Sequence, residues 1–462
     1  MKVLCMARDT VDDRPLESFE QMLEWFTKGC KPKADWRIGT EHEKFAFYTE
    51  DHSPVPYEGE RGIEALLNGM QAELGWEPIT DEGRIIGLAG GEGEGAISIE
   101  PGGQFELSGA PLETIHETCR ESNQHLRAIK AVGRELGMGF LGLGSSPVWT
   151  FAETPRMPKS RYKIMSAYMP KVGTRGLDMM YRTATIQANL DFSDEDDMRR
   201  KLQVSLRLQP LTTALFANSP FTDGKPNGEL SWRGGVWRDV DNQRGGYQPQ
   251  MLDPAFGFEE YVKWCLDIPM YFIIRDGRYV DMTHMTFREF FEGKAASEMP
   301  GVVPTMGDWS NHVSTLFPDV RLKRFLEMRG ADGGPWRRIC ALPALWAGLL
   351  YDEQALGEAE DYVRDWSAEE VGALRDSVPE KGLGAEICGT SMLEAGKHIL
   401  KVAKGGLERR NYLNSEGFDE RLFLVPLEEV VAAGRTSADN LLWMYRGPWE
   451  GDIDRVFEEM AY

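Results

Sequence analysis

The segment "RIGTEHEKFAFY" (residues 37–48) has the composition of a buried β-strand, yet it carries two acidic side chains. Because side chains alternate along a strand, Glu41 and Glu43 share one face while Lys44 points to the other. The two carboxylates are then about 7 Å apart along the backbone. Burying neighbouring carboxylates is costly unless cations or hydrogen-bond donors compensate. The segment therefore predicts a source of positive charge elsewhere in the fold.

The overall composition argues against several classes of function. The 462 residues include 74 acidic and 52 basic side chains, which gives a net charge of −22 at pH 7. Such a charge repels nucleic-acid phosphates and anionic membrane surfaces, so we expect neither as a partner. No apolar run reaches the roughly 18 residues that cross a bilayer, and "MKVLCMARDT" lacks the apolar core of a secretory signal. We expect a soluble protein in the cytoplasm.

The cysteines do not form a recognisable motif. All six are far apart in the sequence and no CxxC pair occurs, which argues against a disulfide-stapled fold. We expect reduced thiols that lie mostly in the core, with no local pattern that marks a catalytic one. These residues are Cys5, Cys30, Cys119, Cys265, Cys340 and Cys388.

Helical and strand-like segments alternate along the whole chain without repeats, linkers or low-complexity stretches. This organisation favours one α+β unit built around an antiparallel sheet. We expect a single domain over residues 1–462, with a short N-terminal arm (1–15) and a mostly helical part (about 340–462) packed on the same core.

Three segments give sharper local predictions. "RTATIQANLDF" (182–192) alternates strictly and predicts a half-buried strand, with Gln187 and Asn189 on its polar face. Residues 111–136 suit a long amphipathic helix with a proline at its start. "YFIIRDGRYVDM" (271–282) predicts a hairpin that turns at its Asp-Gly pair.

Several familiar catalytic motifs are absent. The segment "GGEGEGA" (90–96) is no phosphate-binding loop, since no GxxxxGK[ST] occurs and Ala96 replaces the third glycine of GxGxxG; a flexible hairpin is the better interpretation. The pairs His42-Glu43 and His116-Glu117 lack the second histidine of a zinc-protease helix. No GxSxG elbow supports a serine hydrolase.

Carboxylates in strand-like segments remain as the chemical signal. Each has an ordinary explanation as a solvated acidic residue, but all of them stand among apolar residues rather than on a charged helix surface. Several carboxylates that converge without histidine or cysteine indicate a site for a hard cation, Mg²⁺ or Mn²⁺, and Mg²⁺ commonly holds nucleotide phosphates. The candidate ligands are Glu41, Glu43, Glu100 and Glu106 around "EPGGQFE", and Glu327 in "VRLKRFLEMRGAD".

Several long blocks are specific enough to carry a family resemblance. They include "WRIGTEHEKFAF", "SIEPGGQFELSGAPLETIHETC" and "LKRFLEMRGADGGPWRRICALPALWAGLLYD", and together they resemble the glutamate-cysteine ligases of the plant and proteobacterial type over about residues 25–462. The resemblance implies a carbon–nitrogen ligase that uses ATP to join the γ-carboxylate of glutamate to the amine of cysteine through γ-glutamyl phosphate, the first step of glutathione synthesis. It also implies a curved antiparallel sheet that forms a funnel with helices outside, as in the catalytic domain of glutamine synthetase.

The same resemblance assigns roles to individual residues. It makes the five glutamates metal ligands, places Arg329 near the transferring phosphoryl group, and makes Arg233 in "LSWRGGVW" both a catalytic and a substrate contact. Asn189 becomes a substrate contact, as does Gln187, which occupies a position where more distant relatives use a metal-contacting histidine.

Two alternatives stay open at this point. The nearest is a related ligase that joins glutamate to a different amine. The other is a non-catalytic metal- or nucleotide-binding protein, which would be expected to lose acidic ligands that are all present here. The sequence does not distinguish a monomer from a homodimer, and it marks neither the cysteine pocket nor feedback inhibition by glutathione. Plant members carry a regulatory cysteine pair at the positions of Met282 and Ser297, so that redox control is not expected.

Overall fold

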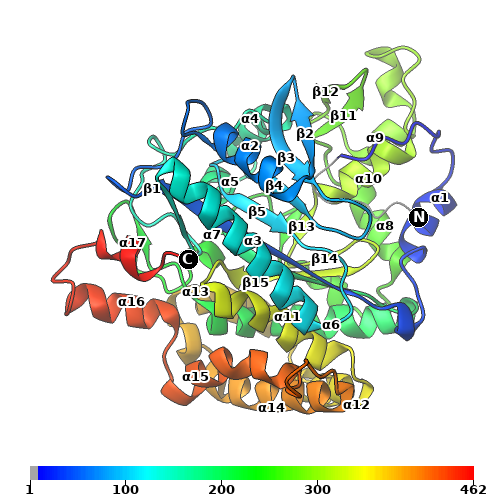
Figure 1. Ribbon diagram of the computed structural model, residues 1–462. Helices are drawn as coiled ribbons and strands as arrows, with labels where there is room; N and C mark the ends of the chain where they lie inside the picture. Colours follow the sequence, from blue (N-terminus) through cyan, green and yellow to red (C-terminus); the bar gives the residue numbers. More distant parts are fainter. Residues whose placement is uncertain (1–8) are drawn as a thin grey trace.

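A large antiparallel sheet lies at the centre of the computed structural model, which describes residues 9–462 (Figure 1). Within these residues, nine strands form the sheet in the order β14-β15-β7-β1-β5-β4-β3-β2, and β6 pairs with the end of β1. They are β1 (Ile38–Tyr48), β2 (Glu77–Asp81), β3 (Arg84–Ala89), β4 (Ala96–Ile99), β5 (Phe105–Ser108), β6 (Met138–Leu141), β7 (Thr185–Leu190), β14 (Val320–Leu322) and β15 (Leu326–Asp332).

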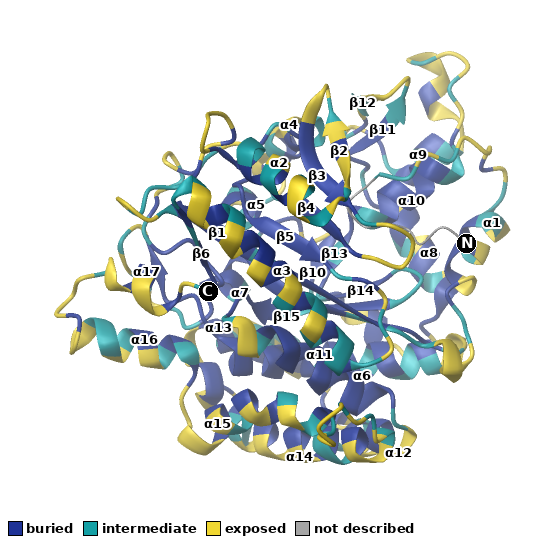
Figure 2. Ribbon diagram, viewed as in Figure 1, coloured by how far each residue is buried: buried dark blue, intermediate teal, exposed yellow. Residues whose placement is uncertain are grey.

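Helices cover one face of this sheet. Helices α3 and α11 pack against β1 and β7, α2 packs against β3, and α6 runs along β15. Figure 2 shows most of the central strands and helix α11 as buried, whereas β2 and the outer turns of α14 and α16 carry exposed residues. The longer helices are α1 (Phe19–Thr27), α2 (Ile63–Leu74), α3 (Ile115–Leu136), α4 (Ser160–Tyr168), α6 (Glu195–Phe216), α8 (Phe258–Leu266), α10 (Met306–Ser314), α11 (Trp336–Leu350), α12 (Glu353–Val363), α13 (Ala368–Lys381), α14 (Met392–Arg410), α15 (Val425–Ala433) and α16 (Ser437–Arg446).

Short elements complete the chain around the other face and at the ends. The helices are α5 (Gly176–Arg182), α7 (Trp232–Val236), α9 (Phe287–Phe291) and α17 (Arg455–Glu459). The small strands are β8 (Phe221–Thr222), β9 (Lys225–Pro226), β10 (Gly245–Gly246), β11 (Phe272–Arg275), β12 (Arg278–Asp281), β13 (Phe317–Pro318), β16 (Glu386–Ile387) and β17 (Thr390–Ser391).

Strand β1 separates an apolar environment from a polar one. On the helix-covered face, the rings of His42 and His125 of α3 meet edge to face with centroids 5.5 Å apart. Lys44 shares that face and is fully buried, and its Nζ donates to the carbonyl oxygens of His42 and Phe105 at 3.2 Å each. Burial lowers the pKa of Lys44 to about 7. Lys44 therefore links β1 to β5 on the helix-covered face of the sheet. The opposite face of β1 carries Glu41 and Glu43.

The predicted α+β class and the strand predictions are confirmed. Residues 182–192 contain β7, and the glycine-rich segment 90–96 joins β3 to β4 as a hairpin. Strands β11 and β12 pair across Asp276 and Gly277, whose φ values of 50° and 71° suit a two-residue hairpin turn. The chain beyond residue 340 is mostly helical, and α14 packs on α11.

The predicted start of the long helix at residue 111 is wrong. Helix α3 begins four residues later, because the side chains of Thr114 and Glu117 form a reciprocal capping box that fixes the first turn. Pro111 precedes this cap and lies outside the helix.

The expectation of mostly buried cysteines is only partly met. Cys265 and Cys340 are buried, but Cys30 and Cys119 are half-buried and Cys388 is exposed. Cys388 faces solvent because it lies in the tight turn between β16 and β17, with φ at 50°. Cys5 and the first half of the N-terminal arm lie outside the described residues. No helix within residues 9–462 combines the length and the apolar character needed to cross a bilayer.

Candidate active site

Strand register brings predicted site residues together on the face that the helices leave open. Glu43 on β1 stands directly opposite Glu106 on β5. Glu41 stands between Gln187 on β7 and Ser108 on β5. Directly opposite side chains in an antiparallel pair have Cβ atoms about 5 Å apart, so like charges there repel unless they are compensated. Three strands, β1, β5 and β7, thus contribute to one polar surface.

A cavity of about 180 Å³ opens on this surface. Seven of the predicted site residues line the cavity. Tyr162 and three basic residues to which the sequence gives no role line it as well. Glu327 is itself fully buried and meets the cavity through its cationic partners. The predicted residues that line the cavity are Glu41, Glu43, Glu100, Glu106, Gln187, Arg233 and Arg329, and the unassigned cations are Arg161, Arg321 and Lys323.

Neutral groups satisfy the carboxylates on the sheet floor. Both oxygens of Glu106 accept hydroxyl hydrogen bonds, from Ser98 at 2.8 Å and from Ser108 at 3.0 Å. Glu43 accepts the backbone N–H of Thr185 at 3.0 Å. These donors orient the carboxylates but bring no full positive charge.

Because their hydrogen bonds bring no full positive charge, three of the buried glutamates have raised pKa values. Burial and the repulsion of Glu327 and Glu106 raise the pKa of Glu41 to about 8. Burial, Glu106 and Glu100 hold the pKa of Glu43 well above its ordinary value. The pKa of Glu100 is raised as well, chiefly by burial. A divalent cation would relieve this repulsion, and carboxylate oxygens are the donors that Mg²⁺ and Mn²⁺ prefer.

The side chains do not form a closed metal cage. Within residues 9–462, no three acidic, histidine or cysteine side chains stand close enough to hold one ion together. Magnesium sites commonly use one or two protein carboxylates and complete their shell with water and substrate phosphates. Asn189, whose Oδ1 is buried without a hydrogen-bond partner, does not itself line the cavity. The carboxylate oxygens therefore fit a hard cation whose coordination shell is completed by oxygens of the substrate.

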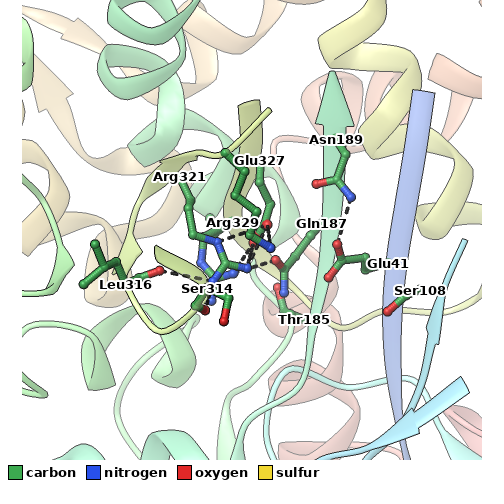
Figure 3. Close-up of polar contacts among 12 residues, drawn as sticks. Glu41, Ser108, Thr185, Gln187, Asn189, Ser314, Leu316, Arg321, Glu327 and Arg329 are labelled. Carbon is green, nitrogen blue, oxygen red and sulfur yellow. Dashed lines mark hydrogen bonds and ion pairs between the residues drawn. The ribbon is translucent and has the colours of Figure 1, made fainter. Parts of the chain in front are cut away.

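Glu327 differs from the other glutamates because protein cations surround it (Figure 3). Nη2 of Arg321 donates to its two carboxylate oxygens at 2.7 and 2.8 Å, Lys323 Nζ lies 3.3 Å away, and Arg329 forms a further ion pair. Burial acts to raise the pKa of Glu327, but the three cations outweigh it and hold the pKa well below the ordinary range. Glu327 is therefore ionised at neutral pH and fixes a cluster of positive charge beside the acidic floor.

Backbone irregularity aims Arg329 into the cavity. The pairing of β15 with β7 shifts by one residue between Met328 and Ala331, which is the signature of a β-bulge. Gln209 of α6 accepts the N–H of Gly330 at 2.8 Å, and a Cβ at that glycine would come within 2.3 Å of the same Gln209 oxygen. With the bulge anchored in this way, Arg329 Nη1 donates to Gln187 Oε1 at 2.7 Å.

Two further predicted residues occupy defined places near this cluster. Asn189 stands opposite Glu327 in the sheet, and its Nδ2 donates to Glu41 Oε1 at 2.8 Å. Arg233 in α7 is 3% exposed and donates from Nη2 to the carbonyl oxygen of Arg329 at 2.8 Å. Burial lowers the pKa of Arg233, although Asp332 and Glu43 counteract it.

Sequence reasoning missed the cations that serve these carboxylates. Arg321 and Lys323 lie in the same segment as Glu327, whose sequence is ambiguous between helix and strand. An extended conformation would have placed all three on one face by alternation. Arg161 and Lys159 stand at the start of α4, far from any acidic motif, so no local signal points to them.

Comparisons with known proteins identify the family of this chain. The sequence profile of glutamate-cysteine ligase family 2 (GCS2) matches residues 37–459. The chain is 52% identical to glutamate-cysteine ligase B, chloroplastic, of Oryza sativa subsp. japonica, over 96% of this chain and 87% of that protein. It is 53% identical to the chloroplastic glutamate-cysteine ligase of Nicotiana tabacum, over 96% of this chain and 83% of the relative.

A solved structure shares the fold at much lower sequence similarity. The glutamate-cysteine ligase of Francisella tularensis, solved in complex with AMP, superposes with a TM-score of 0.53 at 12% identity, covering 92% of this chain and 89% of that one.

One expectation fails in these comparisons. The plant relatives are chloroplastic proteins, and this finding contradicts the cytoplasmic location expected from the sequence. An apolar core marks a secretory signal, and its absence does not identify a compartment. The match of the family profile to most of the chain, and the identity of about half its residues to named relatives, show that this protein belongs to the glutamate-cysteine ligase family.

Proposed function

We propose that the protein uses ATP to join the γ-carboxylate of glutamate to the amine of cysteine, giving γ-glutamylcysteine, ADP and phosphate. An amide cannot form from a carboxylate unless the departing oxygen becomes a better leaving group. Transfer of the γ-phosphoryl group of ATP to the γ-carboxylate gives γ-glutamyl phosphate, and the amine then displaces phosphate from the acyl carbon. The observation that carries this proposal is the acidic cavity bordered by arginines in a chain of this family.

Glu41, Glu43, Glu100 and Glu106 are the proposed ligands of Mg²⁺, with Mn²⁺ as a substitute. Glu327, predicted as a fifth ligand, is fully buried and has both oxygens paired with protein cations, so we propose that it positions Arg321, Lys323 and Arg329 beside the metal. When bound, the metal supplies charge neutralisation for the phosphates and for the incoming carboxylate. The raised pKa values of Glu41, Glu43 and Glu100 support this assignment. We therefore expect metal binding to release protons.

The cationic residues act on the transferring phosphoryl group and on the substrate. Arg329 and Arg233 present guanidinium forks beside the carboxylates, where they favour the negative charge that spreads over the phosphoryl oxygens in the transition state. Gln187 orients Arg329, and Asn189 orients Glu41 through hydrogen bonds already described. Both amides are also proposed substrate contacts. No nucleophilic side chain is required, because ATP itself activates the carboxylate.

We further propose that residues 1–462 act as one catalytic domain. The packing of α14 on α11, and of α11 on β7, supports this view, since the C-terminal helices then belong to the same core as the site. Small-molecule substrates are the expected partners, and a monomer and a homodimer remain equally compatible with the site.

The amine acceptor is the part of the proposal that a related ligase would change. The test is ADP release and mass spectrometry of the product, with glutamate, ATP and Mg²⁺ held constant while cysteine, glycine or 2-aminobutyrate is supplied. We expect γ-glutamylcysteine as the main product, with stoichiometric ADP. Turnover that is independent of cysteine, or faster with another amine, would favour the alternative ligase.

A further inference from the structure

The described part of the N-terminal arm, residues 9–16, is held against the rest of the molecule by hydrogen bonds. It pairs through its backbone with the segment that precedes α10 and then with α10 itself. Its contacts are Leu16 N–H to Pro304 O at 2.9 Å, Met306 N–H to Arg14 O at 2.9 Å, Gly307 N–H to Asp12 O at 2.9 Å, and Thr10 N–H to Asn311 Oδ1 at 2.8 Å.

The arm reaches the wall of the cavity at Asp9. Arg161 Nη1 donates to Asp9 Oδ1 at 3.0 Å, and the hydroxyl of Tyr279 on β12 donates to the other carboxylate oxygen. The two charged side chains are 24% and 16% exposed. In the part of the chain that the structure describes, Asp9 is the one carboxylate at ion-pair distance from Arg161. Arg161 also lines the cavity, so a residue 152 positions away in the sequence holds part of the cavity wall.

Glu100 is the carboxylate on the other side of this arginine. It lines the same cavity, and the hydroxyl of Tyr162, the neighbour of Arg161 in α4, donates to Glu100 Oε1 at 3.4 Å. Burial raises the pKa of Glu100, and the charges of Lys159 and Arg161 work against that rise, so the guanidinium acts on Glu100 without forming an ion pair with it. Arg161 Nε is buried and has no hydrogen-bond partner.

We propose that Asp9 is a positioning residue that holds Arg161 away from Glu100 and so keeps Glu100 available to a divalent cation. A largely buried guanidinium without a counter-charge is costly, so the loss of the Asp9 charge favours a turn of Arg161 toward Glu100, which lines the same cavity. An Arg161–Glu100 pair would then compete with the metal for the same oxygens. This inference rests on the proposed function, because it takes Glu100 as a metal ligand.

The test measures metal binding directly, without turnover. Full-length wild type and the variant Asp9→Asn are titrated with Mn²⁺ in the absence of nucleotide, and unbound Mn²⁺ is read from its EPR signal. We expect the dissociation constant of Asp9→Asn to rise about tenfold, which corresponds to about 1.4 kcal/mol. The matched control is Asp13→Asn, which removes the same charge from an exposed position of the same arm and should bind Mn²⁺ as the wild type does.

Two more variants separate positioning from a general loosening of the arm. Asp9→Glu keeps the charge and should retain most of the affinity. In an Arg161→Met background, no guanidinium can turn toward Glu100, so adding Asp9→Asn should change the dissociation constant by less than about twofold. Circular dichroism spectra that match the wild type establish that each variant is folded.

The outcomes distinguish a failure of the inference from a failure of the proposed function. Wild-type affinity in Asp9→Asn, or a loss that persists in the Arg161→Met background, contradicts the inference and leaves the proposed function intact. A wild type that binds no Mn²⁺, either alone or with a non-hydrolysable ATP analogue, contradicts the proposed metal site and the inference with it.

Discussion

Replacing Glu41 or Glu327 by glutamine should abolish ligation in both cases but shift stability in opposite directions. The two carboxylates are both at least 95% buried, yet their surroundings differ in sign. Asn189 donates to Glu41 at 2.8 Å and other glutamates repel it, whereas Arg321, Lys323 and Arg329 surround Glu327.

The magnitudes follow from the acidities. The folded protein holds a proton on Glu41 up to about pH 8, whereas an ordinary glutamate releases it near 4.5. Each pH unit between these values costs the wild type about 1.4 kcal/mol, so at pH 7 the penalty is on the order of 3 kcal/mol. Glutamine avoids that penalty and still accepts the hydrogen bond from Asn189. We therefore expect Glu41→Gln to stabilise the metal-free protein at pH 7, with a gain that shrinks toward pH 5.

Glu327→Gln should do the reverse. The pKa of Glu327 is lowered in the folded protein, so its contribution to stability is present above about pH 4.5 and is lost as the pH falls. Removing the charge leaves buried cations without their counter-charge, which costs about 3–5 kcal/mol.

Thermal unfolding in EDTA at pH 7 measures both effects, and ADP release at saturating Mg²⁺ measures activity. The reasoning is refuted if Glu41→Gln destabilises the protein as Glu327→Gln does, or if either variant turns over at a rate near that of the wild type.

Three further predictions concern geometry and pH. Arg329→Lys should lower kcat by at least about 100-fold, because an ammonium cannot bridge Gln187 and a phosphoryl oxygen as a planar fork does; steady-state ADP release tests this, and retained activity would make the residue structural. Gly39→Ala should weaken Mn²⁺ binding severalfold. A Cβ at residue 39 would lie 3.1 Å from the Cβ of Asn189, whose amide orients Glu41, and an unchanged EPR titration would contradict this prediction. Glu121 has a pKa raised to about 7 by burial, so the wild type should lose stability as the pH rises from about 4.5 to 7; Glu121→Gln should be more stable at pH 8, by on the order of 3 kcal/mol, and equal near pH 4.5, and parallel pH profiles from chemical denaturation would contradict this.

The parts of the site that depend on local alternation could be predicted from the sequence. Glu41 and Glu43 on one face of β1, with Lys44 behind them, follow from the two-residue period of a strand, and so does the shared face of Gln187 and Asn189. The family resemblance supplied the roles of these residues, which alternation alone does not contain.

Long-range register and irregular backbone could not be predicted in this way. No local pattern states that Glu43 will stand opposite Glu106, because pairing depends on how separate strands slide past each other. The bulge that aims Arg329 arises from the packing of Gln209 against Gly330, and the pair of Asp9 with Arg161 joins segments 152 positions apart. Metal ions are the positive charge that the sequence predicts for all five glutamates, whereas at Glu327 three protein cations supply it.

The central claim is that the acidic floor of the cavity binds the metal of a metal–nucleotide complex. Anomalous diffraction from crystals grown with Mn²⁺, glutamate and a non-hydrolysable ATP analogue tests it most directly. The account predicts Mn²⁺ peaks inside the cavity, within about 2.3 Å of carboxylate oxygens from Glu41, Glu43, Glu100 or Glu106 and bridged to the nucleotide phosphates. Nucleotide bound in the cavity with every Mn²⁺ peak away from these glutamates would contradict it.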